Sequence, residues 1–200
     1  LKAALEIALY DLRAQQFGVP LYQLLGGGTP RLKTDVTISV NDSATMVQDC
    51  LRAVAEGFDA LKIKVGGRSW REDVQSTLAI YRAVGPSVAL RLDANQGWTP
   101  KQAVQAIQAL EAAGLALECV EQPVKADDVA GLKFVTDRTL TPILAYEAVF
   151  SVNDALHILS THSADLINIK LMKTAGISQA IEIAKLARQH HSSCMVGCML

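Results

Sequence analysis

Seven short apolar segments alternate with helix-like segments along this chain, and this alternation limits the possible folds more than any other feature. Continuous apolar strands that are each followed by a helix are typical of a parallel sheet covered by helices. The predicted strands are residues 34–40, 60–65, 87–93, 116–121, 142–146, 165–170 and 193–199. The predicted helices between them are residues 43–56, 70–84, 100–114, 127–137, 151–160 and 177–189.

Seven such units in one run favour an α/β fold of the (β/α)₈ (TIM) barrel type, short of its last strand, over a doubly wound sheet. The sequence has neither the Gly-x-Gly-x-x-Gly pattern nor the phosphate-binding loop that would favour the doubly wound alternative. We expect residues 1–30 to form a helix and a loop that lead into the barrel. Residues 31–200 are expected to form a partial barrel of seven strands.

Composition excludes several classes of protein. Half of the residues are hydrophobic, one fifth are charged, and the formal net charge is −1, which disfavours a nucleic-acid-binding surface. No apolar run is long enough to span a bilayer, and no signal peptide is visible. The cysteines are scattered in a way that favours buried thiols in a reducing, cytoplasmic compartment. The chain begins without methionine and ends within an apolar segment, so we expect a piece of a longer protein.

Two lysines interrupt the second predicted strand. Lys62 and Lys64 are separated by Ile63, so both side chains face the same side of a strand. Burial and mutual repulsion of two ammonium groups would lower at least one of their pKa values and create a base. The alternative is an exposed edge strand with both lysines on its solvated face.

Reading only the carboxyl ends of the strands, where barrel enzymes place their chemistry, gives five polar residues on consecutive strands. They are Lys64, Asp93, Glu121, Tyr146 and Lys170. Each is about one strand–helix unit from the next, so the five side chains are expected to stand side by side. Asp93 and Glu121 supply the carboxylate oxygens that magnesium prefers.

Several motifs resemble the enolase superfamily, in particular its muconate-lactonizing subgroup and the dipeptide epimerases that act on L-Ala-D/L-Glu. The motifs are Lys62-Ile63-Lys64, Asp93-Ala94-Asn95-Gln96-Gly97-Trp98, Glu121-Gln122-Pro123 and the stretch from Asn168 to Lys173, supported by residues 34–40 and 194–199. The resemblance runs along the whole chain. It implies a racemase or epimerase that binds Mg²⁺ and a small dipeptide substrate, and a homo-oligomer is common among such relatives.

The resemblance also implies roles for individual residues. Lys64 and Lys170 would act as acid and base on opposite faces of the substrate α-carbon, and Mg²⁺ on Asp93 and Glu121 would stabilise the enolate. Lys62 would lower the pKa of Lys64. Outside this set, Asn95 is expected to lie beside the metal ligands, and Trp98 either walls the pocket or packs in its loop. We expect Lys173 to be a solvated residue.

One position departs from the family pattern. Relatives read Ala-Asp-Glu-Ser after the fifth strand, and the aspartate is their third metal ligand, whereas this chain has Tyr146 there, followed by Glu147. A neutral phenol is a poor magnesium ligand, and strand alternation predicts that Glu147 points away from the site. The capping domain and the eighth strand of the relatives are also expected to be missing.

The sequence therefore predicts Mg²⁺-dependent epimerisation of an L-Ala-D/L-Glu-type dipeptide by 1,1-proton transfer. Within the same superfamily the alternatives are a muconate cycloisomerase and an N-acylamino acid racemase. From another class, the alternative is a catalytically impaired homologue or fragment, because Tyr146 replaces the third ligand. The four histidines, at 157, 162, 190 and 191, are expected to lie away from the active site.

Overall fold

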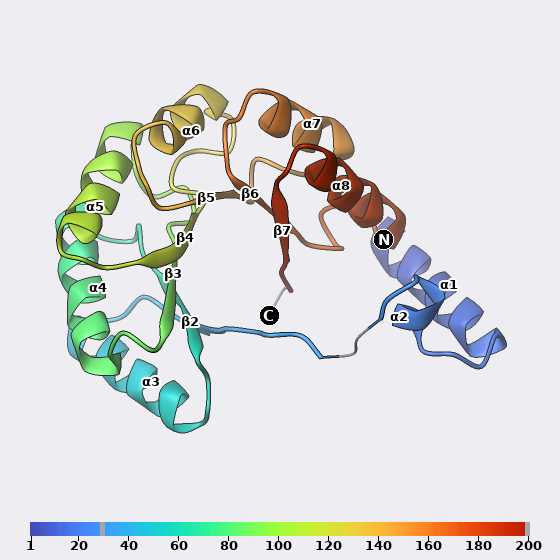
Figure 1. The fold of residues 1–200 in the computed structure, drawn as a ribbon, viewed down its shortest axis with the longest axis horizontal. Helices are drawn as coiled ribbons and strands as arrows, with labels where there is room; N and C mark the ends of the chain where they lie inside the picture. The colour runs from blue at the N-terminus through green and yellow to red at the C-terminus, as the bar shows by residue number, and fades with distance from the viewer. Residues whose placement is uncertain (29–30, 199–200) are drawn as a thin grey trace.

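The computed structural model describes residues 1–28 and 31–198, and within them seven strands form one parallel sheet in the order β1-β2-β3-β4-β5-β6-β7. The sheet curls into an arc with the helices on its outer side, and β1 and β7 lie at its two ends (Figure 1). This is the predicted α/β architecture of a barrel with seven strands. The strands are β1 (Val36–Ile38), β2 (Ala60–Lys64), β3 (Ala89–Asp93), β4 (Leu117–Glu121), β5 (Ile143–Ala145), β6 (Leu166–Ile169) and β7 (Ser193–Val196).

Six helices alternate with these strands as predicted. They are α3 (Ser43–Ala55), α4 (Trp70–Val84), α5 (Pro100–Ala112), α6 (Val129–Thr136), α7 (Val152–Ser160) and α8 (Ile177–Gln189). Reciprocal capping boxes begin α4, α5 and α7, each with a serine or threonine whose side chain accepts from the third helical amide. Helix α3 is capped by Asp42, whose carboxylate accepts the Thr45 amide.

The N-terminal segment forms the predicted opening helix, α1 (Lys2–Gln16), and a second, short helix, α2 (Leu21–Leu24), that the sequence did not predict. α1 lies beside α8 (Figure 1). Two contacts fix it there: the Tyr10 hydroxyl hydrogen-bonds the Ser178 hydroxyl at 3.0 Å, and the Ser178 amide donates to the Glu6 carboxylate at 3.2 Å. The division at residue 30 stays a prediction, and Thr29 and Pro30 lie outside the described residues.

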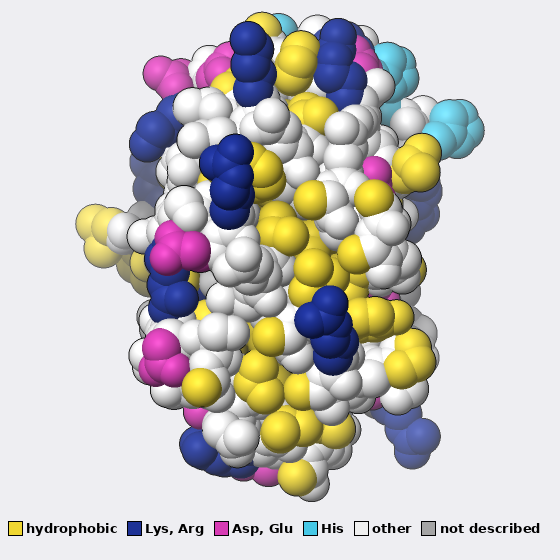
Figure 2. Space-filling view, turned by 90° about the vertical axis from the view of Figure 1, so that its left-hand side faces the viewer, with side chains coloured by type: hydrophobic (Ala, Val, Ile, Leu, Met, Phe, Trp, Pro, Cys, Tyr) yellow, Lys and Arg dark blue, Asp and Glu magenta, His cyan; other side chains and the backbone are white. Residues whose placement is uncertain are grey.

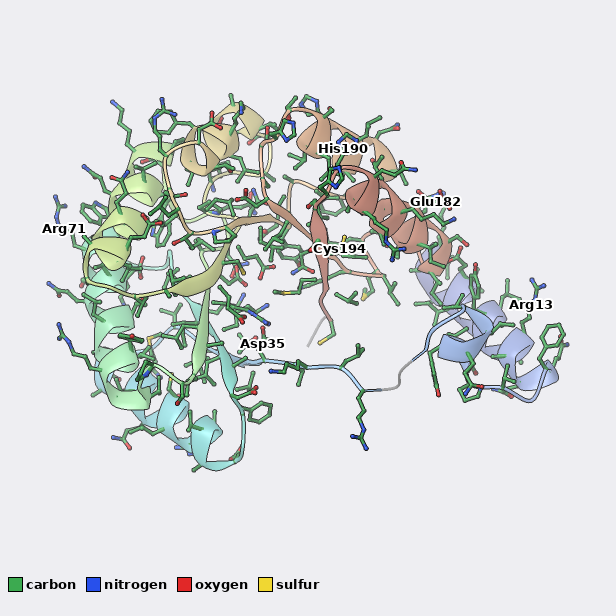
Figure 3. All side chains as sticks on the ribbon, viewed as in Figure 1. Arg13, Asp35, Arg71, Glu182, His190 and Cys194 are labelled. Carbon is green, nitrogen blue, oxygen red and sulfur yellow. The ribbon has the colours of Figure 1, made fainter. Side chains whose placement is uncertain are left out.

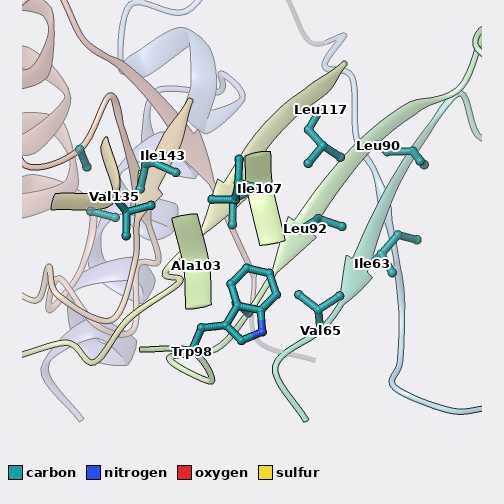
Figure 4. Packing of buried hydrophobic residues seen from close by; sticks show 14 of the residues in the cluster. Ile63, Val65, Leu90, Leu92, Trp98, Ala103, Ile107, Leu117, Val135 and Ile143 are labelled. Atoms are coloured by element: carbon teal, nitrogen blue, oxygen red, sulfur yellow. The ribbon is translucent and has the colours of Figure 1, made fainter. Parts of the chain in front are cut away.

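The two faces of the strands differ in character. Along β2, Leu61 and Ile63 are fully buried in the hydrophobic core against the helices, whereas Lys62 and Lys64 alternate with them and take the inner face of the curl. Figure 4 shows this core, in which Ile63 and Leu92 of the strands pack near Ile107 of α5. The apolar layer thus holds each strand in one rotation about its axis and leaves the inner face available for polar groups.

The outside of the molecule is mixed. Figure 2 shows hydrophobic side chains interspersed with lysine, arginine and acidic side chains over the outer face on the left-hand side of Figure 1, where α4 and α5 lie. Arg71 of α4 and Arg13 of α1 point away from the curl, whereas Asp35 lies inside it (Figure 3). Within the described ranges, no helix is long and apolar enough to cross a membrane.

The strands are shorter than predicted at their ends. β5 stops at Ala145 and β6 at Ile169, so Tyr146 and Lys170 each follow a strand rather than end it. β7 stops at Val196, and residue 199 of the predicted strand lies outside the described residues. The alternation that governs side-chain direction within a strand therefore does not extend to Glu147.

Candidate active site

Strand register brings the first three predicted site residues together. Lys64 is paired with Asp93, and Asp93 with Glu121, in the parallel ladders of β2, β3 and β4. Tyr146 and Lys170 follow β5 and β6 directly. Three of the five residues predicted from the sequence therefore end their strands and the other two directly follow theirs, on five consecutive strands.

The lysines of β2 are paired with carboxylates. Lys62 Nζ lies 3.3 Å from Glu121 Oε2, and Lys64 Nζ lies 3.0 Å from Asp93 Oδ2. Their side chains are only 13% and 34% exposed, and β2 lies between β1 and β3. Both observations exclude the exposed edge strand that the sequence left open.

The pKa of Lys62 moves in the direction opposite to that expected for a repelled pair. Burial tends to lower the pKa of Lys62, but the carboxylates of Glu121, Asp93 and Asp35 outweigh it and raise that pKa above the ordinary lysine value. The prediction had considered the second lysine and not the carboxylates that other strands and the segment before β1 bring close to Lys62. For Lys62, attraction to these carboxylates outweighs the effect of burial on the pKa.

Glu121 is the most enclosed acid of the site. Its carboxylate is almost fully buried, accepts from Lys62 at 3.3 Å and accepts from Asn168 Nδ2 at 2.6 Å. Burial and the nearby Asp93 raise the pKa of Glu121, against the opposing influence of Lys62 and Asn168. The sequence analysis gave Asn168 no role. Its separation of two residues from Lys170, which predicts the same strand face, was the available signal.

Asn95 links three groups of the site. Its Oδ1 accepts from Lys64 Nζ at 2.5 Å, its backbone amide donates to Asp93 Oδ1 at 3.1 Å, and its Nδ2 donates to Glu147 Oε1 at 3.1 Å. Its φ of 43° lies in the left-handed region that asparagine tolerates. Asn95 thus lies beside Asp93, as predicted, and the prediction that Glu147 points away is wrong.

The position of Glu147 follows from a buried glutamine. Gln122 is completely buried, and its Oε1 accepts both the Tyr146 amide at 2.8 Å and the Ala148 amide at 3.1 Å. Holding two alternate amides on one oxygen turns the chain immediately after β5. No feature of the sequence pattern identified this role, although Gln122 directly follows Glu121 at a strand end.

A second buried acid fixes the loops after β2 and β3. The Asp73 carboxylate, on α4, accepts from the Gly66 amide at 3.0 Å and from Trp98 Nε1 at 2.9 Å. The two loops touch at Gly66 and Gly97, where a Cβ on Gly97 would lie 2.5 Å from the Gly66 Cα. Trp98 is 4% exposed and belongs to the core, which decides the open question in favour of loop packing.

The lysines after β6 have a different environment. Lys170 Nζ lies 4.2 Å and Lys173 Nζ 3.9 Å from the centroid of the Tyr146 ring. Lys173 also lies 4.3 Å from the Phe150 ring and donates to the Tyr146 carbonyl oxygen at 2.5 Å. The prediction of a solvated Lys173 is therefore wrong, and burial lowers the pKa of Lys173 to about 8. The loop following β6 folds back onto Tyr146, which the sequence pattern did not indicate.

The described residues do not fit a magnesium ion held by three carboxylates. Within residues 1–28 and 31–198, no group of three histidine, cysteine, aspartate or glutamate side chains is placed to hold a metal ion. Asp93 and Glu121 are close to one another, but their oxygens accept from Lys64, Lys62 and Asn168. Tyr146 presents its ring to lysines at the third position, and Glu147 is directed to Asn95.

Comparison with known proteins identifies the family. The family model described as enolase C-terminal domain-like matches residues 45–200. The chain belongs to this enolase-like family. The family resemblance drawn from the strand-end motifs is thereby confirmed.

Relatives of this enolase-like chain include dipeptide epimerases. It is 51% identical over 199 residues to the L-Ala-D/L-Glu epimerase of Clostridium acetobutylicum, covering 100% of this chain and 55% of the relative. The substrate-liganded L-Ala-D/L-Glu epimerase of Bacillus subtilis is 54% identical, with a TM-score of 0.98, 99% of this chain covered and 55% of that chain. The dipeptide epimerase of Enterococcus faecalis complexed with Mg and L-Leu-L-Tyr is 48% identical, with a TM-score of 0.96 and coverages of 99% and 55%.

The chain spans about half the length of the curated relatives it matches. Three of the four histidines lie apart from the strand-end site, as expected. His162, His190 and His191 line a cavity of about 370 Å³ together with Asp137 and Asp165, beside the ends of α6, α7 and α8. All four cysteines are free thiols; Cys50 and Cys119 are buried as expected, whereas Cys194 is half-buried and Cys198 is exposed.

Proposed function

We propose that this chain carries the proton-transfer residues of an epimerase that inverts the α-carbon of an L-Ala-D/L-Glu-type dipeptide. The observation that carries the proposal is the arrangement of Lys64 and Lys170. These lysines lie at the ends of β2 and β6, four strands apart in the curled sheet, with Asp93 and Glu121 on strands between them. The family and the 51% identical epimerase support it.

The lysines would act in turn on the two faces of one carbon. One amine takes the α-proton, and the ammonium on the other side returns a proton to the opposite face, which inverts the centre. Lys64 Nζ is held in place by Asp93 and Asn95, whose side-chain oxygens accept from it at 3.0 Å and 2.5 Å. Lys62 and Asn168 would keep the buried Glu121 charged and fixed.

Magnesium belongs to the proposal only for an enzyme that has aspartate at position 146, and not for this chain, which has Tyr146 there. The Enterococcus faecalis relative is complexed with Mg, and Asp93 with Glu121 would supply two of its ligands in this chain. Tyr146 removes the third carboxylate, so no catalytic step is assigned to the ion here. This substitution also favours the second candidate, a catalytically impaired homologue.

Other members of the superfamily remain as alternative activities. A muconate cycloisomerase or an N-acylamino acid racemase would use the same lysines. The 54% identity to a dipeptide epimerase, against 28% to the muconate lactonizing enzyme of Pseudomonas putida, favours the dipeptide. We further propose a cytoplasmic location, no nucleic-acid or membrane partner, and a homo-oligomer.

Magnesium calorimetry and deuterium exchange test the proposal together. The chain and its Tyr146→Asp variant would be titrated with MgCl₂ and then incubated with L-Ala-L-Glu in D₂O. We expect weak magnesium binding in the chain, tight binding in the variant, and deuterium at the α-carbon only with the variant. Lys170→Met in the Tyr146→Asp background is the matched control and should keep magnesium binding while losing inversion.

Two results would contradict the proposal. If Tyr146→Asp binds magnesium but exchanges no α-proton with any dipeptide, the epimerase assignment fails. If Tyr146→Asp gains neither property, the impaired homologue is the better description.

A further inference from the structure

The Tyr146 ring is shared by two lysines from the segment after β6. The ammonium groups of Lys170 and Lys173 lie 4.2 Å and 3.9 Å from its centroid, and Tyr146 itself is buried. An ammonium within about 6 Å of an aromatic centroid is attracted to the ring electrons, most strongly where water is partly excluded. The ring therefore holds both cations at one place without neutralising either.

The remaining charges of the site do not compensate these lysines. Lys62 and Lys64 each have a carboxylate within ion-pair distance, whereas the described part of the chain places none that close to Lys170 or Lys173. The nearby Glu147 directs Oε1 to Asn95, and its Oε2 is buried without a hydrogen-bond donor among the described residues. This corner of the site therefore has an excess of positive charge.

The titration of Lys173 agrees with this geometry. Burial is the main cause that lowers the pKa of Lys173 to about 8; the Glu147 carboxylate opposes the shift, and the Lys170 ammonium adds to it. A negative charge placed between the two lysines would offset the desolvation cost of the Lys173 ammonium and its repulsion by the Lys170 ammonium.

We propose that Lys170 and Lys173, held on the Tyr146 ring, form a binding site for a carboxylate group of a small molecule and that this site needs no divalent cation. Two ammonium groups can each donate to a carboxylate oxygen, and such charge-assisted hydrogen bonds are the strong class. The inference goes beyond the proposed function because it concerns binding alone and holds whether or not a proton is transferred. The same tyrosine that spoils a three-carboxylate metal site creates this one.

Calorimetry in the presence of EDTA tests the site directly. The whole chain would be titrated with the dipeptide L-Ala-L-Glu, and with its diamide as the control ligand that lacks carboxylates. We expect saturable binding of the dipeptide, at least about tenfold weaker binding of the diamide, and a similar loss in Lys173→Met. Lys185→Met is the matched control, because Lys185 is an exposed lysine of α8 that pairs with Glu182, and it should bind as the parent does.

A second variant separates loss of the site from loss of the fold. Tyr146→Asp places a carboxylate beside both lysines, so in EDTA it should lose affinity for the dipeptide while retaining a cooperative thermal transition. Saturable binding that is unchanged in Lys173→Met, or binding only when MgCl₂ is added, would overturn the proposal. So would equal binding of the dipeptide and the diamide, or no binding in EDTA by a folded parent chain.

Discussion

Two pairs of lysines face the same site and differ in how their charge is compensated. Lys62 and Lys64, on β2, each form an ion pair with a buried carboxylate, Glu121 at the end of β4 and Asp93 at the end of β3, respectively. Lys170 and Lys173, after β6, share an aromatic ring. The pKa of Lys62 is raised, whereas that of Lys173 is lowered to about 8. Burial alone therefore does not decide whether the pKa of a lysine is raised or lowered in this site.

The residue at position 146 determines how the charges of Lys170 and Lys173 are compensated. Buried carboxylates next to β2 favour the ammonium form by direct attraction, which exceeds the cost of removing it from water. At Tyr146 a ring supplies a weaker attraction that leaves the burial cost of Lys173 only partly offset. The same substitution, lysine to methionine, should consequently change stability in opposite directions in the two pairs.

The largest effect is expected for Lys62→Met. This variant leaves the Glu121 carboxylate buried without its cation, and breaking a buried pair costs about 3 kcal/mol of unfolding free energy at pH 7. Urea unfolding measures the change. The double variant Lys62→Met with Glu121→Leu is the control and should recover part of the loss; equal stability of Lys62→Met and the parent would show that the pair contributes nothing.

Tyr146→Asp should give Lys170 and Lys173 a carboxylate neighbour, as Lys62 and Lys64 already have. A carboxylate next to Lys173 favours its ammonium form, so we expect its pKa to rise from about 8 by about one unit or more. The rate of amine labelling at Lys173 as a function of pH, followed by mass spectrometry, reports that pKa. An unchanged labelling profile would mean that burial, and not the missing anion, sets the titration.

Lys173→Met should stabilise the protein at pH 7. The lowered pKa means that the unfolded chain binds more protons than the folded chain between pH 8 and the ordinary lysine value, so the parent becomes more stable as pH rises through that window. The gain from Lys173→Met is expected to be about 1 kcal/mol at pH 7, reduced by partial solvent access. It should shrink toward pH 10.5; a gain independent of pH would contradict the assignment.

The smallest effect is expected at an exposed pair. Lys133 and Asp137 lie one helical turn apart near the end of α6, and both side chains are well exposed. Lys133→Met should change the unfolding free energy by less than about 0.5 kcal/mol. Urea unfolding of this variant sets the baseline for the two site pairs, and a larger loss would place solvent-exposed charges among the main contributions to stability.

Much of the architecture could be predicted from the sequence because it depends on local periodicity. Leu61 and Ile63 alternate with lysines, and such alternation fixes which strand face meets the helices. The even separation of Lys64, Asp93 and Glu121 then predicts their alignment, which the register confirms. The helix predicted from residue 100 begins there as α5 for the same local reason.

The errors occur where the chain leaves a regular element. Strand alternation was extended to Glu147, but β5 ends at Ala145, and Gln122 from the neighbouring strand turns the chain. Lys173 was assigned to solvent because nothing in its own segment shows that Tyr146 and Phe150 cover it. Lys62 was judged by its sequence neighbour and not by Glu121, which is 59 residues away.

The sequence by itself determined the succession of strands and helices, the face that each strand buries, and the five residues that reach the strand ends. These properties depend on residue type and on spacing of a few positions. Only the tertiary structure decided which charges compensate one another, because Coulomb attraction and burial depend on distances between strands that are far apart in the chain. For this reason the pKa of Lys62, which lies beside carboxylates, is raised, whereas the pKa of Lys173, which lies beside aromatic rings, is lowered.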